Sequence, residues 1–357
     1  MSPDVARGAS ATARADAAAP RDVAELEERL SRPDDAVVEA LRLCPGDIVV
    51  LGAGGKMGPS LARMLRRAAD RLDDARRVVA VSRFGAADAE DALREAGVET
   101  IRCDLLDRHA VARLPDAPNV FHLAGQKFGT SAAPAATWGA NALLPANTVE
   151  RYHEARIVVL SSGNVYPLLP VGSPGATEDT PPAPVGEYAM SCLARERIVE
   201  FLSTRHGTRA VLVRLNYAVD LRYGVLVDVA RKVRDGLPID VTMGFANVVW
   251  QGDANRRIAA ALALAERPPL VLNLTGLETV SIRDAAERFG RRFGRPVHLV
   301  GHEAPDALLS DARRAAALLG PPAVSLDRMV DWVGEWIAGG GALLGKPTHF
   351  EERTGRF

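Results

Sequence analysis

A tyrosine and a cysteine, Tyr188 and Cys192, stand four residues apart in the stretch YAMSC at the start of a helix-like run. A phenol has an unperturbed pKa near ~10, so it accepts a proton at neutral pH only where its surroundings stabilise the phenolate. A residue one helical turn later faces the same side and could supply a stabilising charge. A neutral thiol gives no such field, and a thiolate would raise the pKa of the tyrosine. Proton transfer by Tyr188 would therefore need positive charge from another residue.

A glycine-rich loop, GAGGKMG at residues 52–58, follows a β-rich run and precedes a helical pattern that begins near Pro59. Its spaced glycines permit a tight turn and a close approach of the backbone to a pyrophosphate, and the helix N-terminus supplies N–H donors. The order of strand, glycine loop and helix is a strong signal for a dinucleotide site. The expected pyrophosphate contacts are Gly52, Gly55, Lys56, Met57 and Gly58.

The second β-rich run ends in VSRF, which places Ser82 and Arg83 where the dinucleotide fold usually carries an acid for the adenosine ribose. A hydroxyl and a guanidinium suit a 2′-phosphate instead, and the nearest acid, Asp88, lies beyond the strand end. NADP(H) is therefore favoured over NAD(H). NAD(H) stays possible, since Arg83 could simply stack on adenine.

Seven short β-rich runs must position these side chains, and helical patterns separate the first five. Strands that alternate with helices predict a Rossmann-type, doubly wound α/β fold with a parallel sheet covered on both faces. From Ser281 onward helical patterns dominate, which indicates a smaller mixed α/β C-terminal lobe over the carboxyl ends of the strands. The seven runs lie at residues 47–52, 76–83, 98–104, 119–125, 156–163, 209–216 and 270–276.

The expected organisation has three parts. Residues 1–32 form a disordered Ala/Arg-rich extension that leads into a short helix around Val23–Leu30. Residues 33–215, with the strand 270–274, form a dinucleotide-binding domain, and residues 216–357 form mainly a substrate-binding lobe. The chain is 357 residues long and 47% hydrophobic, which suits one large or two moderate globular domains.

The net charge of −1 gives no electrostatic reason to expect nucleic acid or an anionic membrane as partner. No apolar run approaches the length of a membrane span, and the first residues lack the apolar run of a secretory signal. The three cysteines and seven histidines show no metal-ligand spacing. We therefore expect a cytoplasmic protein with reduced thiols and no metal site.

From about Gly46 to about Leu326 the chain resembles the extended short-chain dehydrogenase/reductase family, the epimerase/dehydratase group. The glycine pattern matches, HLAG at 122–125 matches the family's turn beside the cofactor, and SSGNVY at 161–166 matches its serine stretch. EDTPPAPVGEYAMS looks like the loop that leads to the family's tyrosine.

The resemblance implies that Ser162 and Tyr188 are catalytic and that Cys192 stands at the position of the family's lysine. It also implies an NAD(P) cofactor and a homodimer formed through the helices at 137–154 and 188–206. His122 in the HLAG turn is then structural. Further cofactor contacts implied by the resemblance come from Asp104, Leu105, Leu123, Ala124, Gly125, Asn141 and Ser161.

Three departures from the family pattern bear on the reaction. Cys192 replaces the lysine. Ala246-Asn247-Val248 replaces an Arg-Asp-Phe whose arginine helps to hold a nucleotide diphosphate, which argues against a nucleotide-sugar substrate. Ser162-Gly163-Asn164 replaces the Thr-Asp-Glu of the 4,6-dehydratases, which argues against dehydration by that route.

Two sources of positive charge for Tyr188 remain: an oxidised nicotinamide ring and Lys127. The loop AGQKFG, which contains Lys127, resembles the Ala-Gly-Leu-Lys stretch of UDP-galactose 4-epimerases. Our hypothesis is that Lys127 supplies part of the missing field, and a contact with the pyrophosphate alone is the open alternative. For Cys192, a small residue on a packed helix face is favoured over a nucleophile.

The leading function is an NAD(P)-dependent oxidoreductase or epimerase that transfers hydride at a carbinol carbon of a sugar, sugar acid or sugar derivative. The alternative is a catalytically degenerate NAD(P)-binding regulatory or sensor protein, which turnover would exclude. Arg222 could pair with a carboxylate or could be a solvated loop arginine, and Trp250 could line a pocket or the core. The candidate substrate contacts are Asn164, Asn216, Tyr217, Arg222 and Tyr223.

Overall fold

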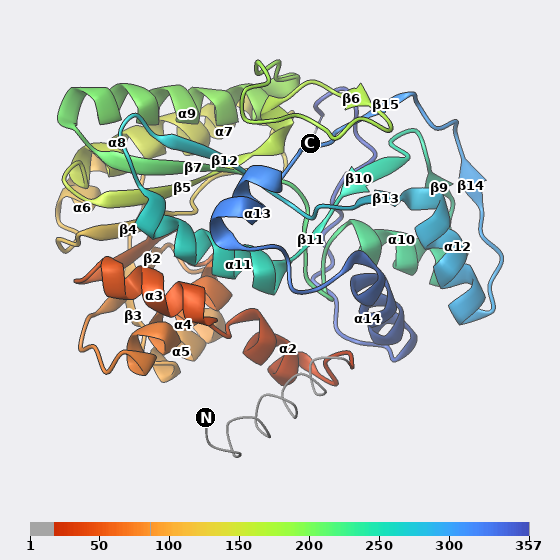
Figure 1. Cartoon of the computed structure of the whole chain (residues 1–357), viewed down its shortest axis with the longest axis horizontal. Coiled ribbons are helices and arrows are strands. Elements are labelled where there is room, and N and C mark those ends of the chain that lie inside the picture. The colour runs from red at the N-terminus through yellow and green to blue at the C-terminus, as the bar shows by residue number, and fades with distance from the viewer. Residues whose placement is uncertain (1–17, 86, 357) are drawn as a thin grey trace.

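The computed structural model describes residues 18–85 and 87–356, and its centre is a seven-stranded parallel sheet (Figure 1). The strand order is β3, β2, β1, β4, β5, β7, β12, so the chain runs outward in both directions from β1. This confirms the predicted Rossmann-type, doubly wound fold. The strands are β1 (Ile48–Leu51), β2 (Val78–Ser82), β3 (Glu99–Arg102), β4 (Asn119–His122), β5 (Arg156–Ser162), β7 (Arg209–Leu215) and β12 (Leu270–Leu274).

Each central strand buries both of its faces, because successive side chains point to opposite sides. In β1, Ile48 and Val50 face one hydrophobic cluster, whereas Val49 and Leu51 face the other. The first cluster is closed by α3 (Asp35–Leu43), α4 (Gly58–Arg71), α5 (Ala87–Glu95), α11 (Gln251–Ala260), η3 (Ala261–Leu264) and α13 (Arg313–Leu319). The second is closed by α6 (Arg108–Ala112), α8 (Leu144–Arg151) and α9 (Gly186–His206).

The segment before α8 is distorted. A short helix α7 (Pro134–Trp138) continues into a π-helical turn, η1 (Gly139–Leu143), which contains Asn141. Single-turn π segments are rare and frequently lie at functional sites. Both elements pack against α9, which carries Tyr188.

A smaller lobe with its own hydrophobic core lies beside the sheet, on the right of Figure 1. Its helices are α2 (Val23–Leu30), α10 (Val225–Arg234), α12 (Ile282–Phe293) and α14 (Leu326–Ala338). Short strand pairs complete it: β8 (Ala218–Val219) with β11 (Val249–Trp250), β9 (Ile239–Asp240) with β14 (Leu299–Val300), and β10 (Phe245–Asn247) with β13 (Thr279–Ser281). At its edge β6 (Leu169–Pro170) pairs with β15 (Asp306–Ala307), and the 3-10 turn η2 (Gly163–Val165) follows β5.

The expected N-terminal helix is present as α2, and it is part of the packed structure. Leu26 and Leu30 are fully buried in the core of the lobe, and Asp22 caps the helix by accepting a hydrogen bond from the Glu25 N–H. Residues 1–17 of the expected extension lie outside the described residues. Within the described chain no helix is both long enough and apolar enough to cross a membrane.

Candidate active site

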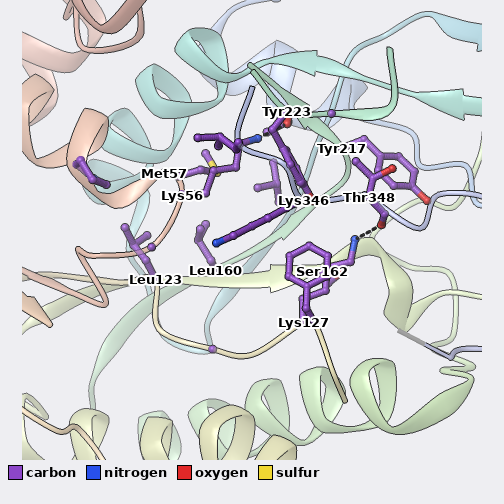
Figure 2. A pocket seen from close by; sticks show the side chains of 18 of the residues that line it. Lys56, Met57, Leu123, Lys127, Leu160, Ser162, Tyr217, Tyr223, Lys346 and Thr348 are labelled. Carbon is purple, nitrogen blue, oxygen red and sulfur yellow. Dashed lines mark hydrogen bonds between the residues drawn. The ribbon is translucent and has the colours of Figure 1, made fainter. Parts of the chain in front are cut away.

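A cavity of about 1140 Å³ opens at the carboxyl ends of β1, β4, β5 and β7, where the strand order reverses direction (Figure 2). Ligand sites of doubly wound folds lie at this switch point. A small-molecule pocket usually measures roughly 300–1000 Å³. The cavity therefore has room for an extended cofactor together with a small second molecule.

The glycine loop forms one wall of this cavity, and its glycines are required by close backbone contacts. Gly52 has a φ of +82°, and a Cβ there would lie 2.6 Å from the backbone of Ala124. A Cβ on Gly58 would collide with the carbonyl group of Ala53. Gly54 and Gly55 are exposed to the cavity and α4 begins at Gly58, so bare backbone and a helix N-terminus face the open space. This cradle fits the pyrophosphate of a dinucleotide.

Lys56 extends from the glycine loop to the lobe. Its ammonium donates a hydrogen bond of 2.8 Å to the carbonyl of Ala218 and lies 4.2 Å from the centre of the Tyr223 ring. Burial lowers the Lys56 pKa to about 7, a shift that Asp220 partly opposes and that the nearby cations Arg222 and Lys127 add to.

Ser162 and Tyr188 meet across the cavity, as the resemblance implies. Ser162 is the last residue of β5, and its hydroxyl donates to Asn164 Oδ1 at 3.0 Å. Tyr188 lies in the first turn of α9 and is hydrogen-bonded to Ser162 and to the thiol of Cys192. Both residues line the cavity. A hydroxyl and a phenol in this position can bind and exchange a proton with one substrate oxygen.

The surroundings of Tyr188 oppose its ionisation in the protein alone. Burial raises the pKa of the phenol far above its usual value, and Cys192 raises it further. The hydrogen bond with Ser162 and the charge of Arg195 act in the opposite direction. Cys192 itself is 1% exposed and packs in a small buried cluster, and burial raises the pKa of its thiol.

Lys127 reaches into the cavity from the loop after β4. Its ammonium donates to the Thr348 carbonyl at 3.5 Å and lies 5.8 Å from the centre of the Tyr217 ring (Figure 2). Burial lowers its pKa to about 8, although Cys192 and Asp228 pull the value back up. Lys127 in turn lowers the pKa of the Cys192 thiol, so the two side chains are close enough to interact. Lys127 thus lies near Cys192.

Polar side chains support the HLAG turn. Asn141 is fully buried, accepts a hydrogen bond from the Gln126 N–H at 2.8 Å and donates to Ser191 at 3.0 Å. Gly125 is exposed to the cavity, and Leu123 also lines it. The ring nitrogens of His122 are buried and have no hydrogen-bond partner among the described residues, and burial lowers the pKa of His122 to about 3, which fits a neutral structural residue.

The residues expected to contact the adenosine lie apart from the cavity lining. Ser82 and Arg83 end β2, and a Cβ on Gly54 would lie 2.6 Å from the Ser82 hydroxyl. Arg83 is exposed. Asp104 is exposed too, but its carboxylate already accepts a hydrogen bond from the Leu106 N–H, and Leu105 is buried in the core.

The substrate candidates separate into two groups. Asn164, Asn216, Tyr217 and Tyr223 line the cavity, and Tyr217 has a φ of +39°, a strained backbone of the kind that gathers at functional sites. Arg222 also lines the cavity, but its guanidinium is paired with Asp220 and Glu27 at 2.6 Å each. It is therefore not a solvated loop arginine. Trp250 is 1% exposed and packs edge-on against Trp332, so it belongs to the core.

Sequence reasoning missed three groups of cavity residues. Val23 and Glu27 of α2 and Arg63 of α4 line it near Arg222, and nothing in the sequence signals that an N-terminal helix would reach the site. The C-terminal segment also crosses it. Thr348 holds Lys127 and is anchored to Asp228, whereas Gly355 packs against Gly186 at the start of α9. The cavity residues of this segment are Leu344, Lys346 and Thr348.

The third group is a single residue, Arg195, which lines the cavity seven residues after Tyr188. A signal for it existed. It is a basic residue at helical spacing from Tyr188 on a face that must pack against the sheet. Among the described residues no group of three or more His, Cys, Asp or Glu side chains is placed to hold a metal ion.

Comparison with known proteins agrees with this geometry. The model of the NAD dependent epimerase/dehydratase family matches residues 48–242. The structure of MoeE5 in complex with UDP-glucose and NAD is 23% identical, with a TM-score of 0.65, and the match covers 83% of this chain and 99% of that one. No curated protein sequence gives a significant match.

Two further solved structures show the same fold. The UDP-glucose 4-epimerase of Thermus thermophilus in complex with NAD is 21% identical, with 82% of this chain and 99% of that one covered and a TM-score of 0.66. The UDP-glucuronic acid 4-epimerase of Bacillus cereus in complex with NAD is 20% identical, with 81% and 99% covered and a TM-score of 0.66.

Proposed function

Because this chain belongs to the NAD-dependent epimerase/dehydratase family, we propose that it is an epimerase or oxidoreductase that transfers hydride at a carbinol carbon of a carbohydrate-like substrate. The observation that carries this proposal is the meeting of Ser162 and Tyr188 opposite a bare glycine cradle in one cavity. A protein relieved of catalysis would have no need of this pair, so the sensor alternative is not favoured.

The cofactor is proposed to lie along the carboxyl edge of the sheet, with its pyrophosphate on the glycine loop. NADP(H) is favoured because Ser82 and the exposed Arg83 offer a hydroxyl and a guanidinium at the end of β2. An Arg83→Ala variant should then lose affinity for NADP(H) and keep its affinity for NAD(H). The proposed contacts are Gly52, Gly55, Lys56, Met57, Gly58, Ser82, Arg83, Asp104, Leu105, Leu123, Ala124, Gly125, Lys127, Asn141 and Ser161.

When bound, the nicotinamide would supply the group that accepts or donates hydride. The Ser162 hydroxyl would then donate a hydrogen bond to the reacting substrate oxygen, and the phenol oxygen of Tyr188 would take or return its proton. Lys127 would favour the phenolate in place of the absent lysine. Cys192 at that position only packs, since burial keeps its thiol neutral.

The cavity lining favours an anionic substrate within this class, such as a sugar acid. Two half-buried lysines, Lys56 and Lys127, each have an ammonium held by a main-chain carbonyl and an aromatic ring. Only one acid, Glu27, stands among the described residues of the lining. The cationic lining residues are Lys56, Arg63, Lys127, Arg195, Arg222 and Lys346. Asn164, Asn216 and Tyr217 would bind substrate hydroxyls.

We further propose the division into a dinucleotide-binding domain at 33–215 with strand 270–274 and a region at 216–357 that is mainly a substrate-binding lobe. A cytoplasmic homodimer through η1, α8 and α9 is also proposed. The exposed apolar side chains Leu143, Met190 and Phe201 on these elements support it, and light scattering of the purified protein would test it.

The decisive experiment measures cofactor binding and turnover on one preparation. NADP(H) and NAD(H) are titrated by fluorescence, and reduced-nicotinamide absorbance is then followed with sugars, sugar acids and nucleotide sugars. Because a retained cofactor hides epimerisation, products are also analysed directly. Turnover that is lost in Tyr188→Phe supports the proposal, whereas tight cofactor binding with no product from any panel member favours the sensor alternative.

Lys127 is tested in the same assay with Lys127→Ala. If Lys127 supports the phenolate, the variant loses activity and the acid limb of its pH profile moves to higher pH. Full activity with an unchanged pH profile would refute this role, and a contact with the pyrophosphate would then be the remaining role for Lys127.

A further inference from the structure

Arg195 is a buried cation held only by neutral groups. It is 5% exposed, and its guanidinium donates to the Leu160 carbonyl at 2.6 Å and to Asn141 Oδ1 at 2.7 Å. A third, longer bond of 3.3 Å reaches the main-chain carbonyl of Asn141. These acceptors fix the position of the charge without neutralising it.

The nearest acid in sequence does not pair with Arg195. Glu196 is fully buried and committed to Arg214 at 2.7 Å and to the Ser161 hydroxyl at 2.5 Å. Arg195 has no carboxylate partner within ion-pair distance among the described residues, whereas many other arginines do. A buried charge without a counter-charge is costly, and charged groups in such surroundings cluster at functional sites.

Arg195 lies where it can supply the positive charge that Cys192 does not provide to Tyr188. Residues 188, 192 and 195 of one α-helix lie at relative angles of about 0°, 40° and −20°, so their side chains share a face. A cation three residues beyond the missing lysine can therefore act on the same phenol. Arg195 and Tyr188 both line the cavity, and the charge of Arg195 favours the ionised forms of both Tyr188 and Cys192.

The HLAG turn is adapted to this arginine. A Cβ on Gly125 would collide with the outer guanidinium nitrogen of Arg195 and would lie 2.8 Å from Asn141 Oδ1. Any larger residue at position 125 would therefore displace the guanidinium of Arg195. This contact is independent of the helical spacing.

We infer that Arg195 is the positioning residue that supplies the fixed positive charge which Cys192 cannot, acting through Tyr188. The inference rests on the proposed function. The groups that act on Tyr188 are Cys192 and Arg195 from α9 and Ser162 from β5. Lys127, from the loop after β4, acts on the neighbouring Cys192 and lines the same cavity. Lys127 loses its charge as the pH rises past about 8, because its pKa is lowered to that value. An arginine keeps its charge throughout this range.

The test reads the ionisation of Tyr188 directly. The protein is labelled with 3-fluorotyrosine and saturated with oxidised nicotinamide dinucleotide, and the fluorine resonance of Tyr188 is assigned by its loss in Tyr188→Phe and followed against pH. Arg195→Gln removes the charge, Arg195→Lys keeps it, and Cys192→Lys on the Arg195→Gln background returns a charge to the family's position.

We expect Arg195→Gln to raise the Tyr188 pKa by about 1–3 units, the usual effect of a neighbouring opposite charge. Arg195→Lys should raise it less, and the Cys192→Lys rescue should lower it again. An unchanged Tyr188 pKa in folded Arg195→Gln would overturn the inference, and so would failure of the rescue in a folded double variant.

If Arg195→Gln does not fold, Gly125→Ala decides the question, because it displaces the guanidinium and leaves every charge in the chain. Since Gly125 is also a proposed cofactor contact, the Tyr188 pKa of this variant is compared with that of the wild type in the absence of cofactor. A raised Tyr188 pKa then supports the inference and an unchanged one overturns it. The readout needs no substrate. If the variants show these pKa shifts and the protein shows no turnover, the proposed function is refuted and the inference about Arg195 is still supported.

Discussion

Replacing Arg214 by methionine should be among the most destabilising single changes in this protein. Arg214 is 3% exposed and forms a bidentate pair with Glu196, with bonds of 3.0 and 2.7 Å from Nε and from one terminal nitrogen. Its other terminal nitrogen donates to the Tyr166 hydroxyl at 2.6 Å, and that hydroxyl donates to Asn273 at 2.8 Å. The pair therefore ties α9 to β7, and the Tyr166 hydroxyl connects Arg214 to β12.

The magnitude follows from what the substitution leaves behind. Methionine fills much of the volume, so the cavity cost is small, but Glu196 stays fully buried with only the Ser161 hydroxyl as partner. Removing one partner of a buried pair costs about 3–5 kcal/mol, and the lost bond to Tyr166 adds about 1 kcal/mol. Arg214→Met should thus cost about 4–6 kcal/mol. Adding Glu196→Gln removes the stranded charge and should return at least about 2 kcal/mol.

The assay is urea unfolding at pH 7, followed by circular dichroism, on the wild type, both single variants and the double variant. The cycle gives the coupling free energy between the two side chains. If Arg214→Met lost less than about 1 kcal/mol, or if the double variant were no more stable than Arg214→Met, the idea of a stranded carboxylate would be wrong.

Three further predictions concern the cavity walls. Gly58→Ala should collide with Ala53 and abolish most cofactor affinity, as a fluorescence titration of a variant with unchanged circular dichroism will check. Lys56→Met should stabilise the protein by up to about 4 kcal/mol near pH 6. The pKa of Lys56 is about 7 in the folded protein and 10.5 in the unfolded chain, so below pH 7 the ammonium is charged in both states and its burial destabilises the folded state most. The free energy of unfolding of the wild type should then increase relative to that of the variant as pH rises from about 7 to 10.5. A difference between the two free energies, measured by urea unfolding, that does not change with pH would contradict this. Asp228→Asn should weaken the anchor of Thr348, and limited proteolysis should cut the C-terminal segment faster than in the wild type.

Local rules were enough to predict the sheet. All seven strands lie within the expected runs, since buried parallel strands and their glycine turns leave dense apolar patterns. Cavity residues such as Lys56, Lys127, Ser162 and Tyr188 were also predicted, because each lies at the end of a strand, in the loop after one or in the first turn of a helix at the switch point.

Other parts of the site could not be predicted, because they depend on contacts distant in sequence. Arg222 is neutralised by Glu27 of α2, a pairing that no local pattern encodes. The lining by Lys346 and Thr348 comes from a segment without regular structure. Arg195 was overlooked for a different reason. Its spacing from Tyr188 was visible, but its isolation from acids became apparent only once Glu196 was seen bound to Arg214.

The cavity wall formed by the C-terminal segment has a consequence for the synthesis and folding of the protein. Lys127, near the middle of the dinucleotide-binding half, is held by the carbonyl of Thr348, and the turn before Tyr188 rests on Gly355. A nascent chain on the ribosome can complete its sheet well before these residues emerge. The part of the cavity wall formed by Leu344, Lys346 and Thr348 is missing until these residues have left the ribosome, so assembly of the sheet should precede completion of the cavity.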